Sequence, residues 1–387
     1  MDKDSREYHA YKILQHWKAT KEILSADTFI SKDNPSYPLF AFLYQQTKEL
    51  YEVLPKRKNG ENSFIHPINV VLALTEAGID DPVTLCAGLV HDYVEELVDK
   101  YKDEQRLTEE GTDILKLEEY EQIITRQFAE ELTVCCQKNA IPTQYADDII
   151  AVTRLLTRQK RDFYYQSICN IFIHPNENIK EKAIQVKLAD RMHNILSIEN
   201  FSEQERIYAC FKNLFILNNV KKHLAEIRRE ALFGEELTPT ERLFKRSAKA
   251  TYDAFLLLCE MKTKSIGDVR SMLHLAFRKF AWENNGVLAV TDLAKDEVHL
   301  MRLYHQVVRK YDARLRHRWQ EFKQIREDEF AYCQRFFADF AFSDKQIQDI
   351  LDYKDAYSLK EVIAMLLYVR EFVVGRFEYS NLFCGRW

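Results

Sequence analysis

Signals for the start of an α-helix recur along this chain and restrict its fold more than any other feature. In a capping box, a Ser or Thr at the helix start and a Glu or Gln three residues later each bond the other's backbone N–H. The spacing is present at Ser202 and Glu205, Thr238 and Glu241, Ser343 and Gln346, and Ser358 and Glu361. Asp81 followed by Pro82 is a further start, with proline at the first helical position. Nine glycines and eight prolines in 387 residues are few for the tight turns of a β fold, so we predict an all-α protein.

The length of the chain suggests more than one folding unit. A single hydrophobic core rarely supports 387 residues. Gly234 can end one helix, and Thr238 with Pro239 can begin another. We therefore predict an N-terminal helical segment at 1–37, a first domain at 38–232 and a helical C-terminal domain of unknown role at 238–387. Residues 99–122 are acidic with few large apolar groups, which predicts a solvated connection within the first domain.

Charge and hydropathy narrow the classes of partner. The net charge is −5 and gives no overall attraction to nucleic acid, so nucleic-acid binding is not expected and an anionic ligand requires a local basic pocket. No run of about 18 apolar residues is present, and the first residues lack the apolar segment of a signal peptide. We therefore expect no association with a membrane and a location in the cytoplasm.

The string HDYVEE gathers one imidazole and three carboxylates. We expect His91 and Asp92 to lie inside the helix that starts at Asp81, with Glu95 and Glu96 one turn later. Taken alone, such a string is more typical of a solvated, acidic helix end than of a catalytic site. Its interpretation depends on the residues that accompany it.

Two other segments carry side chains of the same chemical types. His66, followed by Pro67, starts an apolar helix, and Asp190 lies within an amphipathic helix. Separately, the histidine is typical of a helix cap and the aspartate of a salt-bridged surface group. Together, a His, a His-Asp pair and a distant Asp resemble the ligand set of the HD superfamily of metal-dependent phosphohydrolases. Two imidazoles and two carboxylates suit Mn²⁺, Fe²⁺ or Zn²⁺ better than Mg²⁺ or Ca²⁺.

Longer matches narrow the resemblance to one family. They are RKNGE at 57–61, FIHPINV at 64–70, LVHDYVEE at 89–96, AVTRLLT at 151–157 and VKLADRMHNI at 186–195. In this order, the segments resemble the hydrolase domain of RelA/SpoT homologues, the enzymes of the guanosine alarmones ppGpp and pppGpp. The resemblance covers about residues 38–230 and implies an HD-domain helical bundle, followed by a second helical region.

The resemblance also implies a reaction and the residues that perform it. The metal ligands would be His66, His91, Asp92 and Asp190. Manganese is the expected metal, and Glu95 and Glu96 match an acidic pair that positions or deprotonates the attacking water. The reaction would remove pyrophosphate from the ribose 3′ position and return GDP or GTP.

Several residues near the motifs are candidates for binding the nucleotide. By resemblance, Arg57 and Lys58 match a basic pair that meets the guanosine nucleotide, and Asn194 matches a residue that contacts the substrate. Arg154 is one of several nearby basic side chains that could hold a phosphate, although most charges on helices are simply solvated.

The acidic pair departs from the pattern of the family. The second acid is usually an aspartate followed by threonine, whereas Glu96 is followed by Leu97 in this chain. The longer side chain moves the carboxylate outward by about one methylene, which can change the position of the attacking water. Two alternatives therefore stay open: an HD phosphohydrolase that acts on another nucleotide, and a weakly active nucleotide-binding regulatory protein.

Residues 238–387 lie outside the resemblance. They show neither the alternating strands nor the basic, glycine-containing nucleotide site of an alarmone synthetase domain, so alarmone synthesis is not expected. The region is rich in Phe and Tyr at spacings typical of a helical core. Its size and aromatic content suggest a homo-oligomer or a protein partner bound through this region.

Overall fold

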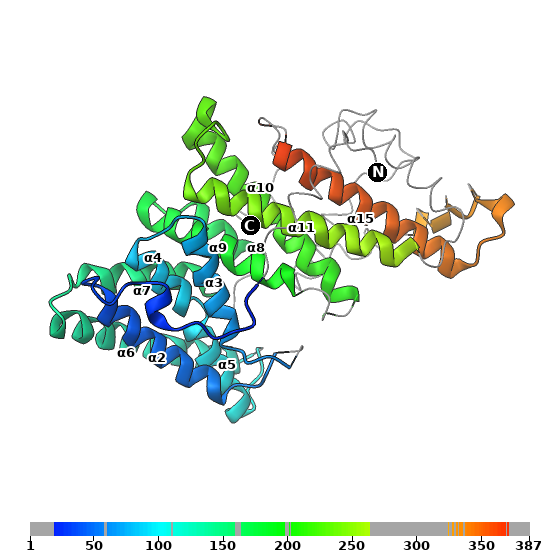
Figure 1. The fold of residues 1–387 in the computed structure, drawn as a ribbon. Coiled ribbons are helices and arrows are strands. Elements are labelled where there is room, and N and C mark those ends of the chain that lie inside the picture. Colours follow the sequence, from blue (N-terminus) through cyan, green and yellow to red (C-terminus); the bar gives the residue numbers. More distant parts are fainter. Residues whose placement is uncertain are drawn as a thin grey trace. The chain divides into compact units, whose positions relative to one another are not determined.

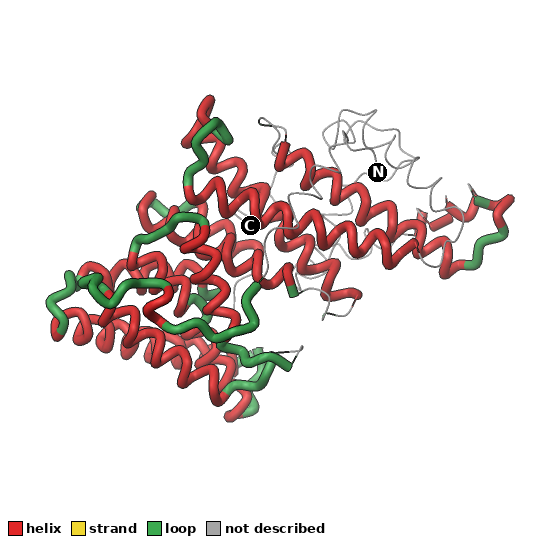
Figure 2. Tube along the Cα trace, in the orientation of Figure 1, coloured by secondary structure: helices red, strands yellow, loops and turns green. Residues whose placement is uncertain are grey.

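The computed structural model is a set of α-helices joined by turns (Figure 1; Figure 2). The residues that it describes are 19–57, 60–109, 111–158, 164–197, 201, 203–263, 324, 327–328, 330–331, 333–335, 337–368 and 370. No strand occurs among these residues, which confirms the predicted all-α class for the described part of the chain.

The helices of the described part vary widely in length. The α-helices are α2 (Tyr37–Val53), α3 (Ile65–Glu76), α4 (Pro82–Val90), α5 (Tyr93–Gln105), α6 (Asp113–Lys138), α7 (Gln144–Leu156), α8 (Tyr164–Phe172), α9 (Glu177–Leu196), α10 (Glu203–Arg228), α11 (Pro239–Thr263) and α15 (Asp344–Tyr368). Short 3-10 helices are η1 (Ala26–Thr28), η3 (Arg229–Ala231) and η7 (Ala338–Phe340). None of the helices in these ranges combines the length and the apolar composition that a membrane span requires.

The chain separates into two compact units. One contains the described residues among 18–194 and 226–247, and the other contains those among 195–225 and 248–377. Within the described residues, the boundaries between the units fall inside α9, α10 and α11. The division into domains near residues 233–240 stays a prediction.

Helix α4 lies at the core of the first unit, where it packs against α2, α3 and α7. Every residue of α4 after Pro82 is buried. A Cβ atom at Gly88 would lie 2.6 Å from Cδ1 of Leu74 in α3, so the glycine permits a close approach of the two helices. The end of α4, which leads into His91, is thereby held close to α3, the helix that carries His66.

Two predicted helix starts in the first unit are confirmed by their hydrogen bonds. The Asp81 carboxylate accepts from the backbone N–H of Thr84 at 2.8 Å and from its hydroxyl at 2.6 Å. At the start of α11, the backbone N–H of Thr238 donates to Glu241 at 2.7 Å, and the backbone N–H of Glu241 donates to the Thr238 hydroxyl at 3.2 Å. Both caps supply acceptors for backbone donors that have no partner within the helix.

The other predicted starts have different outcomes. The Ser343–Gln346 box is formed at the start of α15 and is confirmed. Ser358 and Glu361 lie inside α15, so a helix start at that point is wrong. Serine is also tolerated within a helix, so the spacing alone does not distinguish the two cases. Ser202 lies outside the described residues.

Asp81→Ala is expected to lower the free energy of unfolding by about 1–2 kcal/mol, because α4 loses its N-cap acceptor. Asp81 also forms an ion pair with Lys182 of α9. Asp81→Asn is the matched control, because it keeps a capping oxygen and removes only the charge. Urea unfolding of the three proteins measures the effect, and equal losses in both variants would assign it to the ion pair instead of the cap.

The prediction of a solvated connection at 99–122 is wrong. Helices α5 and α6 occupy most of this segment, leave a short turn between them and pack against each other. Val98 and Leu117 are buried. The rings of Tyr101 and Tyr120 stack with their centroids 3.9 Å apart. The acidic side chains among the described residues of this segment are exposed or half-buried, so the acidic composition reflects the solvent side of a packed hairpin.

Candidate active site

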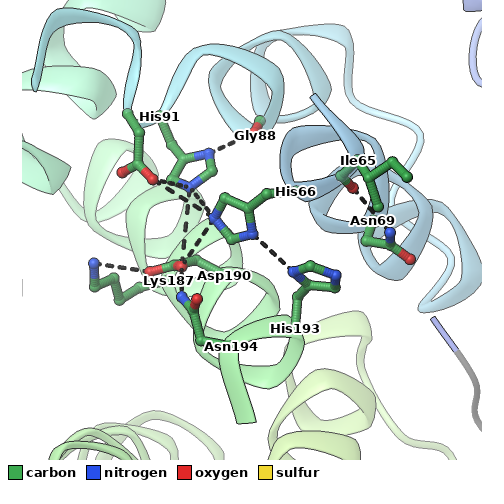
Figure 3. A network of polar contacts seen from close by, with 10 residues as sticks. Ile65, His66, Asn69, Gly88, His91, Lys187, Asp190, His193 and Asn194 are labelled. Atoms are coloured by element: carbon green, nitrogen blue, oxygen red, sulfur yellow. Dashed lines mark hydrogen bonds and ion pairs between the residues drawn. The ribbon is translucent and has the colours of Figure 1, made fainter. Parts of the chain in front are cut away.

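Side chains from three parts of the first unit meet at one point (Figure 3). They are His66 near the start of α3, His91 and Asp92 between α4 and α5, and Asp190 in α9. His66, His91 and Asp190 are 5%, 2% and 4% exposed, respectively. Asp92 is half-buried, so solvent reaches the cluster on its side.

The His91–Asp92 pair interrupts the helix instead of lying inside it, which corrects the prediction. Asp92 has φ −103° and ψ 0° and is the N-cap of α5, yet its carboxylate accepts no capping hydrogen bond. In an unbroken helix, adjacent side chains point about 100° apart. At the break, His91 Nε2 lies 3.1 Å from Asp92 Oδ2, so two consecutive residues can contact the same ion.

The ring nitrogen Nε2 of His66 lies in the middle of the cluster. It is 3.1 Å from Nε2 of His91, 3.4 Å from Oδ1 of Asp190 and 3.5 Å from Oδ2 of Asp92. The two histidines and Asp92 offer three ligand atoms within 4.8 Å of one another. The fold therefore brings together all four residues that the sequence analysis selected as metal ligands.

A backbone contact decides which nitrogen of His91 carries the proton. Nδ1 of His91 lies 2.8 Å from the carbonyl oxygen of Gly88, which can only accept, so Nδ1 donates. In the neutral ring, Nε2 is then a bare lone pair that faces His66 and the two carboxylates. Facing acceptors of this kind repel one another unless a cation lies among them. The donor set therefore fits a divalent metal ion.

Electrostatic interactions also favour positive charge at this point. Burial alone would lower the pKa of His91, but the charge and hydrogen bond of Asp92 and the charge of Asp190 outweigh it and raise this pKa to about 9. Burial would raise the pKa of Asp92, but the charge of His91 and hydrogen bonds from both histidines hold it below its usual range. The Asp92 carboxylate is thus ionised, as a metal ligand must be.

The acidic pair lies directly after the break. Glu95 and Glu96 are in the first turn of α5, and both are half-buried. The pKa of Glu96 is raised to about 7, first by burial and then by the negative charges of Asp92, Asp99 and Glu95. A carboxyl group with a pKa near neutrality suits proton transfer to and from water at physiological pH.

The residues predicted to bind the nucleotide differ in how close they lie to the cluster of histidines and aspartates. Arg57 is half-buried, and its charge interacts with that of Asp190. Asn194 donates from Nδ2 to Oδ1 of Asp190 at 2.6 Å, so it holds the carboxylate of a candidate metal ligand. Arg154 is exposed in the last turn of α7, and Lys58 lies outside the described residues.

Two further residues of α9 contact the cluster. Lys187 is one of the basic side chains near the motifs that could hold a phosphate, but neither it nor His193 was predicted to contact the metal ligands. Lys187 Nζ lies 3.0 Å from Oδ2 of Asp190, and Nδ1 of His193 lies 2.8 Å from Nδ1 of His66. These residues stand three positions before and three after Asp190, which places all three on one side of the helix. Helical periodicity around Asp190 is the signal that would have identified them.

Comparison with known proteins relates the chain to one family of enzymes. It is 32% identical over 155 residues to the probable guanosine-3′,5′-bis(diphosphate) 3′-pyrophosphohydrolase of Mycoplasma pneumoniae, a match that covers 40% of this chain and 18% of that protein. The protein of the same name from Mycoplasma genitalium is 32% identical over 144 residues, or 37% of this chain and 16% of that protein. The guanosine-3′,5′-bis(diphosphate) 3′-pyrophosphohydrolase of Aquifex aeolicus is 24% identical over 203 residues, or 50% of this chain and 24% of that protein.

The matches cover only a part of each relative. This chain spans between 16% and 24% of the length of these three curated proteins. No protein-family profile and no solved structure matches it. Over about half of its length, the chain is therefore homologous to guanosine-3′,5′-bis(diphosphate) 3′-pyrophosphohydrolases of the RelA/SpoT family.

Proposed function

We propose that this chain hydrolyses the 3′-pyrophosphate of guanosine alarmones, so that ppGpp or pppGpp and water give GDP or GTP and pyrophosphate. The observation that carries the proposal is the convergence of two histidines and two aspartates at one point, with an acidic pair at the start of the next helix. The names of the homologous proteins support a guanosine bis(diphosphate) as the substrate.

The proposed ligands are His66, His91, Asp92 and Asp190. We propose Mn²⁺ as the metal, with Fe²⁺ or Zn²⁺ as alternatives, because the mixed nitrogen and oxygen donors suit these ions. When bound, such an ion lowers the pKa of water and stabilises negative charge on phosphoryl oxygens. Lys187 and Asn194 hold the two oxygens of the Asp190 carboxylate at 3.0 Å and 2.6 Å, so this ligand is oriented before any ion binds.

The remaining side chains of the site bind and orient the reactants in this proposal. Glu95 and Glu96 orient the attacking water, and a carboxylate oxygen of this pair accepts its proton. The residues proposed to hold the nucleotide are Arg57, Lys58, Arg154 and Asn194. Of these, Arg57 suits a phosphate group best, because its planar guanidinium can donate two parallel hydrogen bonds from a half-buried position near the cluster.

Product analysis tests the proposed function. The purified chain with Mn²⁺ is expected to convert ppGpp to equal amounts of GDP and pyrophosphate, which anion-exchange chromatography resolves. A parallel panel contains a 3′-phosphorylated cofactor and a dinucleotide. Cleavage of one of these with ppGpp left intact would show that the substrate is another nucleotide. Binding of ppGpp without cleavage of any compound would show a nucleotide-binding regulatory protein.

Two broader expectations stay proposals. We place the chain in the cytoplasm, where its guanosine nucleotide substrate would be found. A homo-oligomer or a protein partner bound through residues 238–387 would give the second helical region its role. Light scattering of the purified chain measures directly whether it forms a homo-oligomer.

A further inference from the structure

His193 makes a buried contact with the metal ligand His66. It lies in α9, one turn after Asp190, and its Nδ1 is 2.8 Å from Nδ1 of His66. His193 is 4% exposed and His66 is 5% exposed, so water does not compete strongly for this hydrogen bond. Figure 3 shows that His66 lies between His193 on one side and His91 and Asp190 on the other.

Proton placement in this contact follows from the chemistry of the imidazole ring. Two ring nitrogens at 2.8 Å share a single proton, so one donates and the other accepts. Nε2 of His66 faces His91 and the two carboxylates and must be a bare lone pair if it is to bind a metal. The proton of His66 is then on Nδ1, and Nδ1 of His193 must accept it.

We propose that His193 is a positioning residue, which fixes His66 in the tautomer and ring orientation that direct its Nε2 at the metal. The inference rests on the metal site of the proposed function and extends it to a residue outside the ligand set. Hydrogen-bond partners of metal-bound histidines commonly act in this way.

The two histidines of the centre are fixed by different means. His91 donates to the backbone carbonyl of Gly88, a partner that no side-chain substitution at position 88 removes. His66 depends on a side chain, which a substitution can remove. Without an acceptor at position 193, His66 can move its proton to Nε2 and rotate, and both changes oppose metal binding.

Two substitutions at one position separate the acceptor from the bulk of the side chain. His193→Leu fills the space without an acceptor, whereas His193→Asn places Oδ1 near the position of the imidazole Nδ1. The EPR signal of free Mn²⁺ in titrations of each protein gives its dissociation constant for the ion. We expect His193→Leu to weaken Mn²⁺ binding by about 10–100-fold and His193→Asn to bind more tightly than the leucine variant.

The outcomes distinguish this inference from the proposed function. If the unchanged chain binds none of Mn²⁺, Fe²⁺ and Zn²⁺, the metal site is wrong and the proposed function with it. Tight binding by the unchanged chain and by folded His193→Leu would overturn only the role of His193. Equal weakening in the Leu and Asn variants would also overturn it, because the acceptor would then be irrelevant. Circular dichroism verifies folding, and His193→Met replaces the leucine variant if that variant does not fold.

Discussion

Asp190→Ala is expected to abolish both metal retention and hydrolysis of ppGpp. Oδ1 of this buried residue lies 3.4 Å from Nε2 of His66, and it is the only proposed ligand from α9. Loss of a metal that supplies several kcal/mol of charge stabilisation corresponds to about a thousandfold or more in rate. Metal content after dialysis and GDP release measure the two effects.

The control for Asp190→Ala is Asp147→Ala. Asp147 is an exposed aspartate in the first turn of α7, so its removal should leave the metal content and the rate of GDP release unchanged. If the Asp190→Ala protein keeps its metal and its rate, Asp190 is not a ligand, and the centre must be assigned to other residues.

Glu96→Gln is expected to reduce kcat by about 10²–10⁴-fold, the contribution typical of a general base. The amide cannot accept a proton from water, but it has nearly the same size as the carboxyl group. The variant should therefore fold and bind the metal like the unchanged chain, which dialysis and metal analysis verify. Glu96→Asp, which has the aspartate typical of the family, should keep more activity than Glu96→Gln. Glu104→Gln, an exposed change in α5, is the control.

The pH dependence of turnover provides a second measure of Glu96. A base acts only when it is deprotonated, so kcat/KM should fall as the pH falls through the pKa of Glu96. This pKa is about 7, and a nearby cation favours the charged form of the carboxyl, so the acid limb should lie below pH 7. If kcat/KM of the Glu96→Gln variant still fell over the same pH range, a group other than Glu96 would be responsible for the fall.

The helical class and the helix starts could be predicted because they depend on short segments of sequence. Asp81 and Thr84 make their hydrogen bonds within four residues, as do Thr238 and Glu241. Such contacts form within a few residues of one another, so the spacing of residue types indicates them. The same spacing at Ser358 and Glu361 lies inside α15, so a capping box also has to coincide with the end of a helix. The four candidate ligands were selected from motifs that the fold then brings together, although their role as ligands stays a prediction.

The parts that were wrong or missed depend on tertiary structure. The apolar pattern continues through His91 and Asp92, so nothing in the local sequence marks the break at which both side chains turn to the same point. The hairpin of α5 and α6 was missed because its acidic surface dominates the composition, whereas a few apolar residues such as Val98 and Leu117 make its packed side. His193 acquires its role only because α3 places His66 beside it.

The proposed ligands come from three separate parts of the chain, which are α3, the α4–α5 junction and α9, and this has a thermodynamic consequence. In an unfolded chain His66, the His91–Asp92 pair and Asp190 are far apart, so an ion that binds the assembled centre binds the folded state much more tightly. By linkage, a free ion concentration of about 100 times the dissociation constant adds about 2.7 kcal/mol to the stability of the fold. A chelator should therefore lower the melting temperature, and starvation for metal in a cell would expose the chain to proteolysis at the same time as it stops turnover.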